Sequence, residues 1–196
     1  DLQAPVATCG GDLVVTNGGN LTLYAAATNG SGAAGALLDV AGGIVVGAAS
    51  TLSLQAHPLN GGAPRVKADR VAVLAGGAIE AVGRGFAGGT NRSDGFGPGR
   101  SFYDNQRVSY PSGAAHGGAG GGSFTLPRQG RGLPYGSAQA PLLPGSGSSG
   151  HAADKGGAGG GVVRIVASGE LRIDGLIAAD GGVGLGLGGG VGGGAG

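Results

Sequence analysis

Residues 162–182 read VVRIVASGELRIDGLIAADGG, three short apolar runs that directly follow the glycine-rich stretch GGAGGG. Apolar and polar side chains alternate within the runs, and Gly or Asp separates one run from the next. This period of two is typical of β-strands, and the separators are typical turn residues. Similar runs recur without any helical period at 13–15, 21–25, 37–40, 44–46, 51–56, 66–68, 71–74 and 78–81. The pattern therefore predicts an all-β chain of short strands.

The spacing of the runs, about ten residues, suits a sandwich, a barrel or a solenoid. Internal similarity favours the solenoid, because VAVLAGGAIEAVG (71–83) and LRIDGLIAADG (171–181) each contain two strands around a tight turn and end in I-x-A-x-G. In a parallel β-helix, small or β-branched residues stack inward from rung to rung, and Gly or Asn occupies the corners. We therefore expect a right-handed parallel β-helix with Val, Ile, Leu and Ala inside.

Residues 83–161 differ from the strand-like segments, because they are rich in glycine and proline and hold all but one of the aromatic residues. A structureless loop of this length is improbable in a compact domain. We expect an excursion of extended or polyproline-like segments, packed on one face of the solenoid. Its expected anchors are Phe86, Phe96, Phe102, Tyr103, Tyr110, Phe124 and Tyr135. The predicted organisation is solenoid rungs over 1–82, the excursion over 83–161, returning rungs over 162–182, and a glycine-rich tail over 183–196 that we expect to be cut short.

The order of the glycine-rich motifs carries a resemblance to known proteins. GRGFAGG, HGGAGGG, YGS with PLLPGSG, KGGAGGGVVRI and LRIDGLIAADGG follow one another between residues 71 and 182, over half of the chain. This order resembles the glycine-rich, β-solenoid-like modules of large, mostly uncharacterised extracellular and surface proteins. The resemblance implies a surface or matrix location, and it implies no catalytic residues.

The glycosylation sequons point to a location outside the cell, and that location guides the interpretation of the single cysteine. Asn20, Asn29 and Asn91 stand in N-x-[ST] sequons, the acceptor pattern for N-linked glycans. They predict a secreted, extracellular or cell-surface glycoprotein. Cys9, the only cysteine, is interpreted as a small buried residue, a free thiol or half of a disulfide to a molecule outside the chain, and we favour the last.

Composition and residue spacing disfavour several classes of chemistry. The net charge is +1, and no basic patch interleaved with aromatic residues suggests a nucleic-acid partner. No apolar run has the length of a membrane span. The histidines (His57, His116 and His151) lack metal-ligand spacing. The acidic residues are dispersed among turns, whereas glycosidases need two carboxylates at a defined separation. We expect no catalytic residues and no cofactor, and calcium between Asp-Gly turns stays an alternative.

These observations predict a non-catalytic structural or assembly module of an extracellular fibre, wall or surface appendage. We expect it to associate with itself or with other subunits of the assembly. A carbohydrate-binding adhesin that takes glycans as partners is the alternative, and a polysaccharide-acting β-helix enzyme is a third hypothesis.

Overall fold

The computed structural model describes residues 5–27, 35–103, 112–122, 130–137, 139–151 and 154–185, which form ten strands and no helix. The chain divides into two compact units. Unit 1 comprises the described parts of Asp1–His57, Gly62–Ala81 and Val163–Ala178, and unit 2 comprises those of Pro58–Gly61, Val82–Val162 and Ala179–Gly196.

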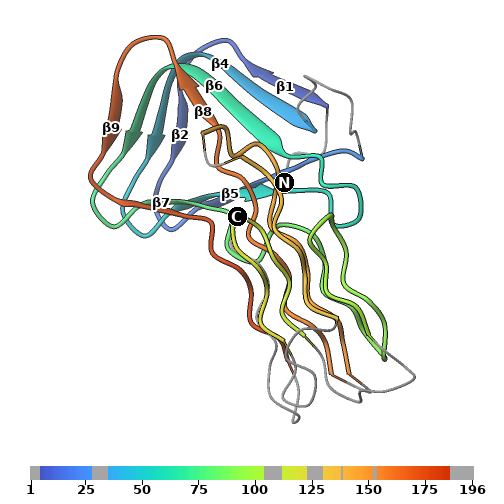
Figure 1. Cartoon of the computed structure of the whole chain (residues 1–196). Helices are drawn as coiled ribbons and strands as arrows, with labels where there is room; N and C mark the ends of the chain where they lie inside the picture. Colours follow the sequence, from blue (N-terminus) through green and yellow to red (C-terminus); the bar gives the residue numbers. More distant parts are fainter. Residues whose placement is uncertain are drawn as a thin grey trace. The chain divides into compact units, whose positions relative to one another are not determined.

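Unit 1 contains two parallel sheets (Figure 1). The first sheet has the order β1–β4–β6–β8, with β2 beside β4 and β9 beside β6, and the second has the order β3–β5–β7–β10. Every strand pairing is parallel. The strands are β1 (Val6–Cys9), β2 (Leu13–Val15), β3 (Asn20–Tyr24), β4 (Ala36–Val46), β5 (Thr51–Gln55), β6 (Pro64–Val73), β7 (Ala78–Glu80), β8 (Ile165–Ala167), β9 (Leu171–Ile173) and β10 (Leu176–Ala178).

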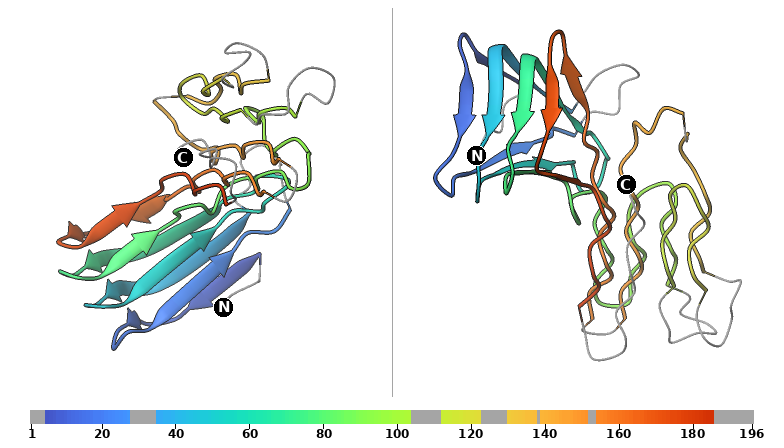
Figure 2. Two further views of the ribbon diagram at one scale, coloured as in Figure 1. Left: turned by 90° about the horizontal axis from the view of Figure 1, so that it is seen from below. Right: turned by 90° about the vertical axis from the view of Figure 1, so that its left-hand side faces the viewer.

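The strands stack as four rungs, in each of which the chain crosses the first sheet, turns a corner and continues in the second sheet (Figure 2). The rungs are β1–β2–β3, β4–β5, β6–β7 and β8–β9–β10. The first three corners are four-residue turns at 16–19, 47–50 and 74–77, each closed by a hydrogen bond from its last amide to its first carbonyl at 3.0, 3.2 and 2.8 Å. In the first corner, Asn17 and Gly18 both have positive φ, at 57° and 75°, which are backbone conformations favoured by Asn and Gly.

Aliphatic side chains form the core of unit 1. Because partners in a parallel ladder face the same side of the sheet, the register aligns inward side chains from successive rungs into rows. Alanine, valine, isoleucine and leucine supply these rows, and in the middle rungs the side chains are almost completely buried. Three of the rows, called here the inner rows, are Leu13–Ile44–Val71–Leu171, Val15–Val46–Val73–Ile173 and Leu21–Leu52–Ile79–Ile177.

The predicted right-handed parallel β-helix is wrong. The two parallel sheets remain open, and no closed solenoid forms among the described residues. Closure requires each rung to return to its starting edge, but the connection at 56–63 contains no strand. This connection carries Pro58, which lacks an amide donor, and the pair Gly61–Gly62, and both residue types disfavour a strand interior.

Unit 2 is held together mainly by hydrogen bonds between extended, glycine-rich segments (Figure 2). The bonds recur every three residues. Gly156 and Gly159 donate to the carbonyls of Gly89 and Phe86, both at 2.9 Å, and the amides at 147 and 150 donate to the carbonyls at 96 and 93, also at 2.9 Å. Three residues per turn is the period of the polyproline II helix, which makes no internal hydrogen bonds. Where such a segment is buried, its backbone groups must bond to neighbouring segments.

Glycine at every third position allows the segments of unit 2 to pack this closely. A Cβ atom on Gly85, Gly88, Gly156 or Gly159 would overlap backbone atoms of an adjacent segment. The positions 85 and 88, like 156 and 159, are three residues apart, which matches the period of the hydrogen bonds. Unit 2 therefore packs backbone against backbone, whereas unit 1 packs side chain against side chain.

Candidate interaction edge and pocket

The last rung of unit 1 continues the inner rows but leaves them uncovered. Val71 and Val73 in β6 are 1% and 0% exposed, whereas their partners Leu171 and Ile173 in β9 are 53% and 38% exposed. In the second sheet, Ile79 is 0% exposed and its partner Ile177 is 40% exposed. These three exposed side chains have the orientation of core residues without a further strand beside them. We call β8, β9 and β10 the open edge.

Among the described residues, no strand pairs with the backbone of the open edge on its outer side. Val71 donates its amide to the carbonyl of Glu170, and Asp174 donates to the carbonyl of Val73, both bonds between β6 and β9. Backbone groups alternate sides along a strand, so the amides and carbonyls of Leu171 and Ile173 face away from β6. The open edge thus offers both hydrogen-bonding groups and apolar side chains to an incoming strand.

Strands β1, β2 and β3 form the opposite edge of the same two sheets, called here the first edge. Leu13 and Leu21 are half-buried on their inner rows, and Val15 is 7% exposed. On the outer face, Val14 is 57% exposed. Both ends of the strand ladder are therefore uncapped among the described residues.

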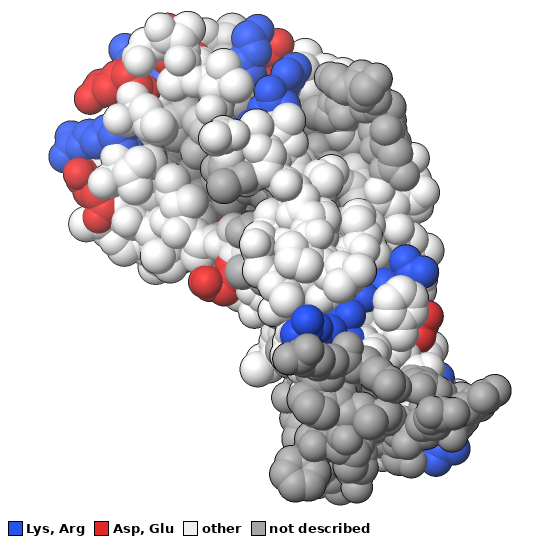
Figure 3. Space-filling model, in the orientation of Figure 1, with Lys and Arg blue, Asp and Glu red and all other residues white. Residues whose placement is uncertain are grey.

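Two ion pairs of unit 1 join side chains of opposite charge. Lys67 contacts Asp39 at 3.2 Å across β6 and β4, and Arg172 in the open edge contacts Asp174 at 2.6 Å. On the face shown in Figure 3, acidic and basic side chains of this part of the chain lie intermixed. The Arg172–Asp174 pair therefore adds no net charge to the open edge.

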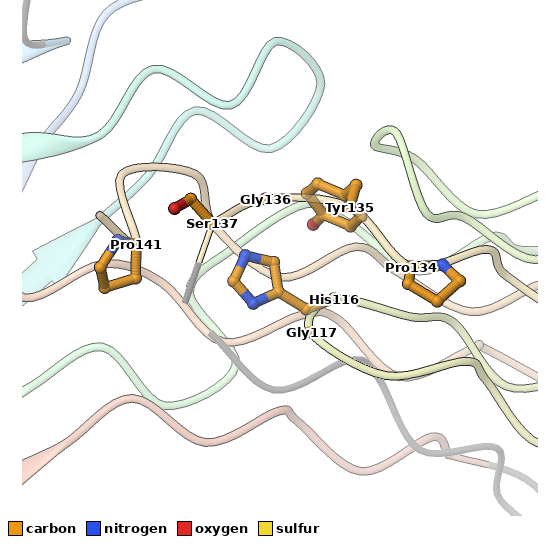
Figure 4. A pocket seen from close by; sticks show the side chains of 7 residues that line it. All are labelled: His116, Gly117, Pro134, Tyr135, Gly136, Ser137 and Pro141. Atoms are coloured by element: carbon orange, nitrogen blue, oxygen red, sulfur yellow. The ribbon is translucent and has the colours of Figure 1, made fainter. Parts of the chain in front are cut away.

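Unit 2 contains a pocket of about 310 Å³, lined by His116, Gly117, Pro134, Tyr135, Gly136, Ser137 and Pro141 (Figure 4). The rings of His116 and Tyr135 meet edge to face, with centroids 4.8 Å apart and planes at 85°. The Nε2 atom of His116 is buried and has no hydrogen-bond partner among the described residues. The walls are thus mostly flat and apolar, with a small number of polar groups, as is usual for small-molecule sites.

The Tyr135 hydroxyl is fixed by two neighbours behind the pocket. It donates a hydrogen bond to the carbonyl of Pro144 and accepts one from Ser146 Oγ at 2.9 Å. Burial raises the pKa of Tyr135 to about 12, an effect that the hydrogen bond from Ser146 opposes. The phenol is therefore neutral at physiological pH, and it positions the ring rather than acting as a base.

The structure places two of the three sequon asparagines, while Asn29 lies outside the described residues. Asn20 is exposed at the start of β3, and its Oδ1 accepts a hydrogen bond from Ser53 Oγ at 3.3 Å. Asn91 is exposed in a turn of unit 2 and has a φ of 51°. Both exposed positions can accommodate a glycan, and glycosylation stays a prediction.

Cys9 is a free, half-buried cysteine in β1. Its thiol contacts the carbonyl oxygen of Asp12 at 3.7 Å. The register aligns Cys9 with Val40, and Val40 with Ala68 and then Ala167. Val40 and Ala68 are buried, so Cys9 begins a fourth inward-facing row, at the first edge. A disulfide to an outside molecule, the favoured interpretation, would therefore have to form at that edge, and it stays a prediction.

The other chemically interesting residues do not gather into one site. His151 Nδ1 lies 4.0 Å from a carboxylate oxygen of Asp154, across the turn where the sequence places both. Among the residues that the structure describes, no three His, Cys, Asp or Glu side chains form a group that could hold a metal ion. The calcium alternative has no support from the described residues and stays untested.

The expected aromatic anchors differ in burial. Phe86 is 5% exposed, and a Cβ on Gly61 or Gly97 would overlap its ring. Phe96 and Phe102 are 39% and 44% exposed, and Tyr103 and Tyr135 are half-buried. Tyr110 and Phe124 lie outside the described residues.

Comparisons with known proteins identify no relative. No protein-family model, no curated protein and no solved structure matches this chain. In the described part of the chain, no helix is long and apolar enough to cross a membrane.

Proposed function

We propose that the chain is a non-catalytic structural module that associates with copies of itself through the open edge, as part of an extracellular fibre, wall or surface appendage. The observation that carries the proposal is the exposure of Leu171, Ile173 and Ile177, which continue three core rows and which no strand of the described residues covers. An uncovered parallel edge with apolar inner side chains is a template for further strands.

The size of the exposed surface supports association. Complete burial of one leucine or isoleucine side chain contributes about 1.5–3 kcal/mol, and 1.4 kcal/mol corresponds to a tenfold change in affinity. Burial of these three side chains, which are roughly half exposed, therefore contributes a substantial part of the binding free energy of a complex of moderate affinity. The extracellular location rests on the three sequons and on the resemblance described above.

The test compares the wild type with two lysine substitutions of matched exposure in the same rung. Leu171 and Leu176 are 53% and 54% exposed, but only Leu171 lies on an inner row. We expect the mass of the wild type, measured by sedimentation equilibrium, to rise with concentration. Leu171→Lys should weaken this association at least tenfold, because stacking would bury its charge, whereas Leu176→Lys should retain it.

Circular dichroism establishes that both variants are folded. A wild type that stays monomeric over the whole concentration range would contradict the proposal, as would equal loss of association in the two variants.

A second candidate function, carbohydrate binding, is favoured by the pocket of unit 2. Flat rings and prolines (His116, Tyr135, Pro134 and Pro141) line it, and the buried Nε2 of His116 has no hydrogen-bond partner in the described part of the chain. Its volume of about 310 Å³ is at the lower end for ligand sites, which suits one sugar ring. Saturation-transfer NMR with a panel of monosaccharides should detect binding that Tyr135→Ala abolishes and Tyr24→Ala retains. Absence of transfer from every sugar would remove this candidate.

A further inference from the structure

The two edges of unit 1 are complementary, because every rung repeats the same hydrogen bonds. The amides of Gly47, Leu74 and Asp174 donate to the carbonyls of Val15, Val46 and Val73 at 2.8, 2.9 and 2.8 Å. In the second sheet, the amides at 51, 78 and 176 donate to the carbonyls at 19, 50 and 77 at 2.9, 3.0 and 3.0 Å. Each rung is therefore almost a translated copy of the one before it.

This repetition determines which groups are unpaired at each end. On β9, the free amides and carbonyls belong to the inward residues Leu171 and Ile173. On β2, the inward residues bond to β4, so the free groups belong to outward residues such as Val14. A strand that runs parallel to β9 and pairs with it must have its unpaired backbone amides and carbonyls on residues whose side chains point outward. Strand β2 meets this requirement.

We propose that copies of the chain stack head to tail, with the open edge of one copy receiving the first edge of the next. This inference rests on the proposed function and names the surface that the open edge binds. The register continues the inner rows, so that Leu171 meets Leu13, Ile173 meets Val15 and Ile177 meets Leu21 of the next copy. All three pairs are aliphatic, and in each pair the side chain that belongs to the open edge is exposed.

A symmetric pairing of two open edges fits the geometry less well. A two-fold axis would make the facing strands antiparallel, and it would carry the second sheet of the partner to the other end of β9. Because the two sheets lie in different planes (Figure 1), only one sheet would then be paired. The head-to-tail arrangement pairs both sheets, and since it does not close, it forms an open filament. Four strand spacings give a rise of about 19 Å per copy.

The single natural cysteine provides a direct test. Cys9 and Ala167 are the two ends of one row, Cys9–Val40–Ala68–Ala167, so in the stack Cys9 of one copy lies beside Ala167 of its neighbour. Within one chain the two positions are three strand spacings apart, about 14 Å, which is too far for a disulfide. We expect Ala167→Cys, oxidised with copper phenanthroline, to form disulfide-linked trimers and longer multimers on a non-reducing gel.

Two variants control for unspecific oxidation. Val166→Cys places the thiol on the outer face one residue away, and it should give no multimers beyond those of the wild type. Ala167→Cys combined with Cys9→Ser leaves one cysteine per chain, so it cannot form more than a dimer. Multimers of equal length in Val166→Cys and Ala167→Cys would overturn the proposed register.

A mixing experiment tests the same arrangement without new cysteines. Leu171→Lys blocks the open edge and Leu13→Lys blocks the first edge, with folding checked by circular dichroism. Each variant alone should be monomeric, and an equal mixture should form dimers but nothing larger. If Leu13→Lys alone associates like the wild type, the head-to-tail inference is overturned while the proposed function stands. If the wild type itself is monomeric, both fail.

Discussion

Substitution of one interior glycine of unit 2 should destabilise this unit severely. In Gly159→Ala, the new Cβ would overlap the carbonyl group of Gly145. Their separation would be well below 3.0 Å, the distance under which Cβ contacts are essentially not found in proteins. Three hydrogen bonds cross this point. Gly159 donates to Phe86 at 2.9 Å, Gly85 donates to Gly159 at 2.7 Å, and Gly145 donates to Gly160 at 2.8 Å.

The expected magnitude follows from these contacts. Loss of three backbone hydrogen bonds costs about 3 kcal/mol, at about 1 kcal/mol each. Overpacking alone costs about 1–3 kcal/mol. Because the segments can relieve the overlap by giving up part of the hydrogen bonding, the two costs do not add fully, and we expect the free energy of unfolding to fall by about 3–5 kcal/mol.

The assay is thermal unfolding followed by the near-ultraviolet circular dichroism of the aromatic residues. Gly118→Ala is the matched control, because a Cβ at Gly118 would have no atom within 4 Å. This control should be neutral or stabilising by up to about 1 kcal/mol, since alanine restricts the unfolded chain. If Gly159→Ala unfolds within about 0.5 kcal/mol of Gly118→Ala, close backbone packing is not what stabilises unit 2.

Three further predictions concern the pocket, the core and the sequons. In ultraviolet absorbance titrations, Tyr135 of the folded protein should ionise near pH 12, whereas the unfolded tyrosine ionises near pH 10.0. The free energy of unfolding should therefore fall as the pH rises from 10.0 to about 12, because only the unfolded state loses this proton there. A Tyr135→Phe variant whose stability has the same pH profile would contradict this. Ile79→Ala should cost about 2–5 kcal/mol and Ile177→Ala clearly less in the monomer, because the exposed fractions are 0% and 40%, and equal urea midpoints would refute the difference. Glycopeptide mass spectrometry of the protein from its native source should find a glycan on Asn91, and unmodified asparagine there would remove the strongest sequon from the secretion argument.

The sequence predicts the strands well because alternation records which side chains are buried. The run at 71–74 overlaps β6, and the run at 171–173 coincides with β9. Two features were missed because the residues at those positions do not show a clear strand pattern. β1 (Val6–Cys9) has a weak apolar pattern, and Gly42 and Gly43 appeared to end a strand although β4 continues through them with a shift in register.

Closure of the rungs was predicted wrongly because glycine and proline occur in two kinds of connection in this chain. At Gly76 and Gly77 they form a tight corner, whereas at 56–63 they form an open connection. Composition does not distinguish the two cases. The pocket was missed because His116 and Tyr135 are distant in sequence and meet only through the packing of unit 2. The sequence predicted association with other subunits but not the residues involved, because the exposure of Leu171 depends on what lies beside its strand.

Hydrogen exchange at β9 tests most directly whether the open edge is where copies associate. The amides of Leu171 and Ile173 face away from β6, whereas those of Val71 and Val73 lie inside the sheet. As protein concentration rises, we expect exchange at Leu171 and Ile173 to slow by at least tenfold, while Val71 and Val73 remain protected throughout. Exchange at Leu171 and Ile173 that stays fast while the mass of the protein increases would show that association uses another surface.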